Sequence, residues 1–131
     1  MKLFFAALLG VVALSVTNGH AAAATPTQLL QSCQTVIKAA AAAQNSTLDI
    51  PVAGLACWYY MAAVQNMSVV VDEHGRHLLG VCAPQNTTLM QYVRIFARYA
   101  QSHRGQDSDN AAALALRALV KAFPCGTRRP A

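Results

Sequence analysis

The sequence predicts a small all-α domain: a bundle of about four helices, stapled by two disulfides, with a short β-hairpin near residues 69–81 as the one element of another kind. Three observations support this fold class. Apolar residues recur at helical spacing in four segments that polar or proline-containing turns separate. The chain of 131 residues begins with an export signal, and it contains four cysteines. A domain of this size is near the lower limit for burying a good core, so covalent links would help to stabilise it.

The first residues have the three-part layout of a secretory signal peptide. Lys2 precedes an apolar run over residues 3–16, and the small residues Ala21 to Ala24 offer cleavage sites after Ala21 or Ala24. A membrane anchor is the alternative, but a spanning helix needs roughly 20 apolar residues and this run is shorter. We therefore expect a signal peptide over residues 1–24, a single helical domain over residues 25–131 and no membrane association after cleavage.

Export places the chain in an oxidising compartment, where cysteines pair. The four cysteines are Cys33, Cys57, Cys82 and Cys125, and four cysteines allow three pairings. None of them forms a C-x-x-C motif, which argues against a thiol oxidoreductase and against a zinc knuckle. We expect structural disulfides, and the count alone does not choose among the pairings.

The first helix should begin at Thr25, because Thr at the N-cap, Pro26 at the first helical position and Gln28 at the third form a capping-box pattern. An apolar stripe at helical spacing then faces the core and contains the first cysteine: Leu29, Leu30, Cys33, Val36, Ile37, Ala40 and Ala41. A polar loop over residues 44–47 ends this helix.

The second helix is expected over residues 52–64, with Asp49 as its cap and Pro51 near its first turn. The segment is apolar on most sides, so we expect it to be the central helix of the bundle. Trp58, Tyr59 and Tyr60 are consecutive and cannot all face inward, so at least one should lie at a rim or an interface. A plain core aromatic cluster is the alternative.

Residues 67–79 are the hardest to assign. The run from Ser68 to Val71 fits either an extension of the second helix or a strand, and residues 69–71 could pair with residues 78–81 as a hairpin. Between them lies a charged turn with glycine near its tip: Asp72, Glu73, His74, Gly75, Arg76 and His77. A charged loop flanked by apolar chain is a natural contact surface, although an ordinary solvated turn is the simpler interpretation.

Two further helices are expected over residues 88–102 and 109–123. Thr88 and Gln91 form a second capping-box pattern, Ser108 or Asp109 should cap the last helix, and Pro124 should end it. If these helices run antiparallel, the cysteines that flank them lie at the same end, which predicts a Cys82–Cys125 bond. Cys33 and Cys57 lie 13 and 11 residues from Ser46 in the first loop (46 − 33 and 57 − 46), which fits a second antiparallel pair and a Cys33–Cys57 bond.

The charge pattern and the polar residues exclude several functions. The net charge is +5, but the basic residues are dispersed with few aromatics among them and the chain is exported, so we expect no nucleic acid partner. A weak attraction to an anionic cell envelope is compatible with this charge. The five acidic residues fall in expected loops or caps, so we expect no catalytic residues, no enzymatic activity and no cofactor. His74 and His77, with Asp72 nearby, are the only metal-like cluster, and without a fourth ligand we expect no metal site.

The ordered set of segments resembles the Tai/Rap family of type VI secretion immunity proteins. The likeness covers nearly the whole mature chain. It comprises the exported start, Leu29-Leu30-x-x-Cys33, the aromatic segment after Cys57, Val81-Cys82-x-Pro84, the helix over residues 89–99 and Ala118-x-x-x-Ala122-Phe123-Pro124-Cys125. The family's second-cysteine pattern resembles Cys-x-Gly-Tyr-x-x-Gly. Here Tyr60 matches the tyrosine, while Tyr59 and Ala63 stand where the family has glycines.

The resemblance implies a small, helical, periplasmic protein, often dimeric, that does no chemistry. It implies a cognate toxin partner: a peptidoglycan amidase whose active-site cleft the immunity protein blocks. Our candidates for partner binding are the 72–77 turn, chiefly Asp72, Glu73, His74, Arg76 and His77, together with Trp58 and Tyr59 at an exposed edge, where they would suggest a homodimer. Two alternatives stay open: a small disulfide-bonded periplasmic structural protein of the acid-chaperone type, and a metal-binding module on the histidine turn.

Overall fold

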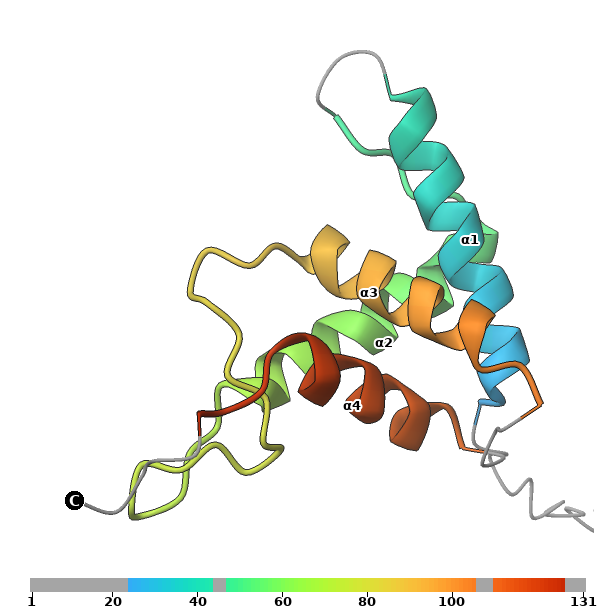
Figure 1. Ribbon diagram of the computed structural model, residues 1–131. Coiled ribbons are helices and arrows are strands. Elements are labelled where there is room, and N and C mark those ends of the chain that lie inside the picture. Colours follow the sequence, from blue (N-terminus) through green and yellow to red (C-terminus); the bar gives the residue numbers. More distant parts are fainter. Residues whose placement is uncertain (1–23, 44–46, 106–109, 127–131) are drawn as a thin grey trace, which may run out of the picture.

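The computed structural model describes residues 24–43, 47–105 and 110–126. These residues form a bundle of four helices, as the sequence predicts (Figure 1). The helices are α1 (Pro26–Ala42), α2 (Val52–Ser68), α3 (Leu89–Ser102) and α4 (Ala111–Ala122). The described residues contain no sheet, only two isolated antiparallel bridges, Val71 with His77 and Val81 with Pro124. The predicted signal peptide lies outside the described residues, except for Ala24.

The capping boxes of α1 and α3 are confirmed. At α1 the Gln28 N–H donates to Thr25 Oγ1 at 3.2 Å, and the Thr25 N–H donates to Gln28 Oε1 at 3.1 Å. Thr88 and Gln91 make the same reciprocal pair at 3.3 and 2.7 Å. These bonds satisfy donors that a helix start otherwise leaves unpaired, so the local sequence alone sets where both helices begin.

The expected caps of the other two helices are wrong. Pro51 itself occupies the N-cap of α2 and no side chain caps that end, so Asp49 does not have the predicted role. Asn110 caps α4 by accepting the Ala112 N–H at 2.8 Å, one or two residues after the predicted Ser108 or Asp109. Ala111, which directly follows this cap, is fully buried, and the predicted caps Ser108 and Asp109 lie outside the described residues.

The prediction that α2 would be the central helix is wrong, because α1 and α3 each contact all three other helices whereas α2 contacts only those two. α3 buries a full stripe: Tyr92, Val93, Phe96, Ala97 and Ala100. α2 buries only Gly54, Cys57, Met61 and Ser68. An amphipathic helix reveals its inward face through its polar residues, whereas α2 is apolar nearly all round and gives no such signal.

Ser32 and Gly54 mark a close contact between α1 and α2. The Ser32 hydroxyl donates to Ala53 O at 2.8 Å and accepts the Cys57 N–H at 3.0 Å, so it bridges the carbonyl and the amide of one turn of α2. A Cβ atom on Gly54 would lie 2.9 Å from Val36 Cγ2. Any larger residue at position 54 would therefore require Val36 or the backbone of one helix to shift.

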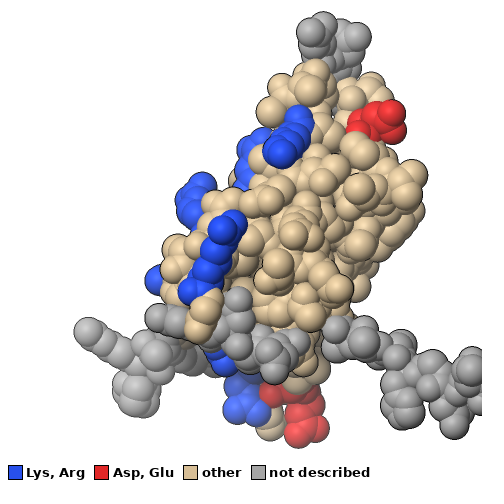
Figure 2. Space-filling model, turned by 90° about the vertical axis from the view of Figure 1, so that its right-hand side faces the viewer, with Lys and Arg blue, Asp and Glu red and all other residues tan. Residues whose placement is uncertain are grey.

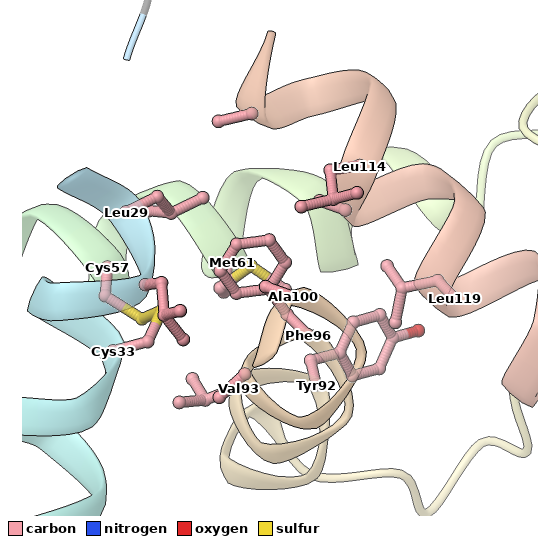
Figure 3. Close-up of a cluster of buried hydrophobic side chains, with 14 of the residues drawn as sticks. Leu29, Cys33, Cys57, Met61, Tyr92, Val93, Phe96, Ala100, Leu114 and Leu119 are labelled. Carbon is pink, nitrogen blue, oxygen red and sulfur yellow. A yellow bond between two sulfur atoms is a disulfide. The ribbon is translucent and has the colours of Figure 1, made fainter. Parts of the chain in front are cut away.

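Both predicted disulfides are confirmed. Cys33–Cys57 joins α1 to α2, and Cys82–Cys125 joins the segment before α3 to the residue after Pro124, with Cα–Cα distances of 5.0 and 4.9 Å. Figure 3 shows the first disulfide at the edge of a core in which Met61, Phe96 and Leu114 of three different helices meet.

The predicted hairpin is only partly correct. The chain does reverse between residues 69 and 81, but it forms one antiparallel bridge, at Val71 and His77, instead of two strands. α2 continues to Ser68 and Val69 forms its C-cap in a helical conformation, so the chain is not extended where the first strand would begin. The reversal projects from the end of α2, away from the helices, at the lower left of Figure 1.

Candidate partner-binding site

The 72–77 turn is held in one shape by the Asp72 carboxylate. Asp72 Oδ1 accepts the backbone N–H groups of His74 and Arg76, both at 2.9 Å. Asp72 Oδ2 accepts from Arg76 Nε at 2.8 Å. Gly75 has φ of 72°, a conformation that favours glycine, and its N–H donates to Asp72 O at 2.9 Å. The tip is therefore an ordered structure although it is exposed.

This geometry lowers the pKa of the Asp72 carboxyl below its ordinary value of 3.8. The largest cause is the hydrogen bond from the Arg76 backbone N–H. The Arg76 side chain and the His74 N–H act in the same direction, and partial loss of hydration opposes them. Asp72 is consequently ionised at every physiological pH, and the turn keeps a fixed Asp72–Arg76 ion pair at its tip.

A buried polar chain connects the turn to the bundle. His77 Nδ1 lies 2.8 Å from Ser68 O, at the end of α2. The Ser68 hydroxyl lies 2.9 Å from the hydroxyl of Tyr92 on α3 and donates to Gln65 O at 2.7 Å. Ser68 and Tyr92 are both almost fully buried, so this chain fixes the direction in which the turn leaves the core.

Exposed apolar side chains flank the charged tip on both sides. Val69 and Leu78 are 69% and 58% exposed, and Val70 and Val71 are also exposed. The Leu78 N–H donates to Val70 O at 3.0 Å, so the two flanks lie against each other at the base of the turn. A charged tip on an apolar base has the composition of a binding surface, because the apolar area gains by leaving water and the charges set specificity. We call residues 69–78 the projecting turn.

A groove of about 510 Å³ runs beside the tip, between the projecting turn and the Cys82–Cys125 disulfide. Its lining comprises His74, Gly75, Arg76, His77, Gly80, Cys82, Cys125 and Gly126. The disulfide thus forms one wall of the space next to the turn, and it ties that wall to the end of α4.

The two histidines of the turn lie next to different groups. His77 faces the Ser68 carbonyl, Asp72 is occupied by the turn itself, and His74 Nε2 lies 3.4 Å from Glu73 Oε1 on an exposed edge. No group of three His, Cys, Asp or Glu side chains positioned to hold a metal ion occurs among the residues that the structure describes.

The structure does not bring Trp58 and Tyr59 to the turn. Tyr59 precedes Ser68 by nine residues of helix, which is about 14 Å along the axis of α2 at 1.5 Å per residue. Trp58 packs half-buried against the core, whereas Tyr59 is 69% exposed. Tyr59 and Ala63, where the resembled family has glycines, both face outward, so they change the surface of α2 and not its packing against α1.

Sequence reasoning recognised that apolar chain flanks the turn, but it did not include those flanking residues among the binding candidates, and it missed the anchor of the turn. The valines at 69–71 could have indicated an apolar binding surface, because three apolar residues beside a charged turn either pair as a strand or stay exposed. The burial of Tyr92 could also have been predicted, since it precedes the core residue Phe96 by one helical turn. The link from His77 through Ser68 to Tyr92 could not have been predicted from a sequence pattern, because it joins residues far apart in the chain.

A family model for Rap1a immunity proteins matches residues 25–125 of the chain. No curated protein and no solved structure matches the chain significantly. The matched range contains all four helices, both disulfides and the projecting turn. Within the described residues, no helix is long and apolar enough to cross a bilayer.

Proposed function

This chain belongs to the Rap1a family of immunity proteins, and from that membership we propose that it protects a cell envelope from a type VI secretion toxin. The toxin would be a peptidoglycan amidase, and the chain would neutralise it by binding in the periplasm. The family implies a cognate toxin partner, and the two disulfides fit a protein outside the cytoplasm. The amidase, the secretion system and the periplasm are our proposals.

The projecting turn is our proposed plug for the toxin's active-site cleft. The observation that carries this proposal is a turn that is both exposed and fixed in shape, by Asp72 at its tip and by His77 at its base. A plug that is already ordered loses little conformational entropy on binding, and this favours tight association. Inhibition then requires no chemistry, because a filled cleft excludes the peptidoglycan substrate.

The two parts of the turn would contribute in different ways. Val69, Val70 and Leu78 would leave water as the cleft closes around the base, which supplies affinity. The exposed Glu73, His74 and Arg76 would select the matching toxin by charge and hydrogen bonding.

The test begins with periplasmic expression of a type VI peptidoglycan amidase, whose lysis of the host the wild-type chain should prevent. Val71→Asp with Leu78→Asp should weaken the toxin complex by at least a hundredfold in titration calorimetry, because both charges would enter the closed interface. Thr27→Asp is the control: it adds an acid at an exposed position near the start of α1, opposite the turn in Figure 1, and should bind like wild type.

The outcomes separate the parts of this proposal. Failure of the wild-type chain to protect against any such amidase would remove the assigned toxin class. Protection that survives the double substitution would retain the immunity function and reject the turn as the plug.

We further propose that a second copy of the chain covers the outer face of α2. The helix carries no charged residue, and its exposed stripe follows helical spacing: Val52, Ala56, Tyr59, Ala63 and Met67. An uncharged stripe with a central aromatic residue has the composition of a homodimer interface. The projecting turn lies beyond the end of this helix, so both copies would keep theirs free.

A further inference from the structure

Four cations lie along α3 and α4, and we call the surface they border the cationic face: Arg94, Arg98, Arg117 and Lys121. All four are exposed, and each helix carries its pair four residues apart, so each pair shares one side of its helix. Arg98 and Lys121 line the same shallow groove of about 230 Å³ between the helices. Arg94 and Arg98 line the adjoining groove of about 360 Å³. Figure 2 shows Lys and Arg side chains in a band along one side of the molecule.

No anion of the described chain compensates these charges. Both ion pairs found among the described residues lie within the 72–77 turn. In Figure 2 one acidic group lies near the top of the molecule on the side away from the band, and the other lies at the bottom, next to basic side chains. Like charges four residues apart on a helix repel each other and destabilise it, and this occurs on both helices. An external anion would relieve that repulsion.

Apolar and aromatic side chains lie between the cations. Ile95 and Tyr99 line the groove and are half-buried. The Lys121 Nζ lies 5.7 Å from the centre of the Tyr99 ring, and the His103 ring stacks on Tyr99 at 3.9 Å. An aromatic ring with a polar tip, set among cations, suits a boundary between an apolar phase and water.

We propose that the cationic face docks on the surface of an anionic phospholipid bilayer, with no segment crossing it. This proposal departs from the expectation, drawn from the sequence, that the mature protein does not associate with a membrane. The charges favour a bilayer over an acidic protein because they spread along two helices instead of converging on one point. The compartment also favours a bilayer as the partner, because two disulfides fit a protein outside the cytoplasm, where membrane surfaces are accessible. This proposal does not depend on the identity of the toxin.

Docking by this face would leave the projecting turn available. The two grooves of the cationic face share no lining residue with the groove beside the turn. A protein held in this way would be concentrated at the membrane while its turn stayed exposed at one end.

The test is sedimentation of the exported protein with vesicles. Vesicles of 30% phosphatidylglycerol in phosphatidylcholine should retain the protein at 50 mM NaCl. Retention should be lost at 500 mM NaCl, because the Debye length shrinks, and pure phosphatidylcholine should not retain it. Arg98→Gln should weaken the partition about fivefold, the ratio for one basic residue at such a surface. Combining it with Arg94→Gln and Lys121→Gln should abolish retention.

Lys38→Gln is the matched control, because it removes one exposed positive charge from α1, at a residue that lines neither groove of the cationic face. It should change the partition less than twofold, and circular dichroism should show all variants folded. Equal losses from Arg98→Gln and Lys38→Gln would show that only the net charge matters and would overturn the proposal. So would absence of vesicle binding, including the case in which the protein instead binds a soluble polyanion such as polyaspartate.

Discussion

At the scale of single residues, Asp72 has the largest effect on the candidate site. Its carboxylate accepts hydrogen bonds from two backbone N–H groups and from an arginine side chain, and these bonds fix the conformation of an exposed turn. Asx-type hydrogen bonds of this kind join residues that are only a few positions apart, so the local sequence is enough to form them.

Our first prediction concerns the pH dependence of this turn. Because the pKa of Asp72 in the folded protein is below 3.8, ionisation of this group stabilises the turn above that pH. The stabilisation should disappear only as the pH falls through the lowered pKa. The NMR shift of the Arg76 amide should thus show a titration step whose midpoint lies below pH 3.8. Glu73→Gln should leave this transition in place and Asp72→Asn should remove it. A transition centred above 3.8 would contradict the assignment.

A second prediction tests the close contact of α1 and α2 at Gly54. An added Cβ would lie 2.9 Å from Val36, which is fully buried and β-branched and so has little freedom to move. Overpacking typically costs about 1–3 kcal/mol, which should outweigh the roughly 1 kcal/mol that alanine gains over glycine in helix propensity. Gly54→Ala should therefore lower the free energy of unfolding in urea, whereas Asn66→Ala, on the exposed side of α2, should not. Equal or greater stability of Gly54→Ala would show that the contact adjusts.

A third prediction concerns the site of signal cleavage. The Ala24 carbonyl accepts the N–H of Ala111 at 3.2 Å, and Ala24 packs against the core. Cleavage after Ala24 would remove this contact and place a positive ammonium at the start of α1, where the helix dipole disfavours it. We therefore expect cleavage after Ala21, which the intact mass of the exported protein will show. A mass corresponding to Thr25 as the first residue would refute this expectation.

At the scale of elements, the two disulfides fasten different parts of the molecule. Cys33–Cys57 is fully buried between α1 and α2, whereas Cys82–Cys125 is half-exposed beside the projecting turn. The sequence separations are 24 and 43 residues. The chain-entropy model gives about 3.5 and about 4 kcal/mol for loops of these lengths, so the two bonds differ mainly in what they hold in place.

The prediction at this scale is that both disulfides stabilise the fold but only Cys82–Cys125 affects toxin binding. Replacing either cysteine pair with alanines should lower the melting temperature by a comparable amount. Only the loss of Cys82–Cys125 should also weaken toxin binding at a temperature where both variants are folded, because that bond walls the groove beside the turn. Equal affinities for the two variants would show that the disulfide does not position the turn.

At the scale of the whole molecule, three surfaces share one small bundle: the projecting turn, the outer face of α2 and the cationic face of α3 and α4. Each is built from different residues, so each can be altered alone. The bundle permits this because α2, α3 and α4 each keep one side exposed to solvent.

The prediction at this scale concerns the homodimer. Tyr59→Arg should raise the dissociation constant of the dimer at least tenfold in sedimentation equilibrium, because it places a charge in the middle of an apolar interface. Gln101→Arg, which adds the same charge on the exposed side of α3, should leave it unchanged. A wild-type protein that stays monomeric at 100 μM would rule out the α2 interface.

Much of this protein follows from local sequence. The four helices, the capping boxes at Thr25 and Thr88, both disulfides and the position of the charged turn were all predicted correctly, because each depends on residues a few positions apart or on antiparallel pairing of neighbouring helices. The family resemblance rested on the same residues, and the match to Rap1a immunity proteins supports it at that level.

The tertiary structure alone decided which helix is central, which residues cap α2 and α4, and how the turn is aimed. α2 is apolar on nearly every side, so its periodicity could not select an inward face; contact with α1 and α3 did. The valines at 69–71 lacked a partner strand and remained exposed. His77, Ser68 and Tyr92 meet only after α2 packs on α3, and burial makes their hydrogen bonds obligatory, because an unpaired polar group in the core is costly.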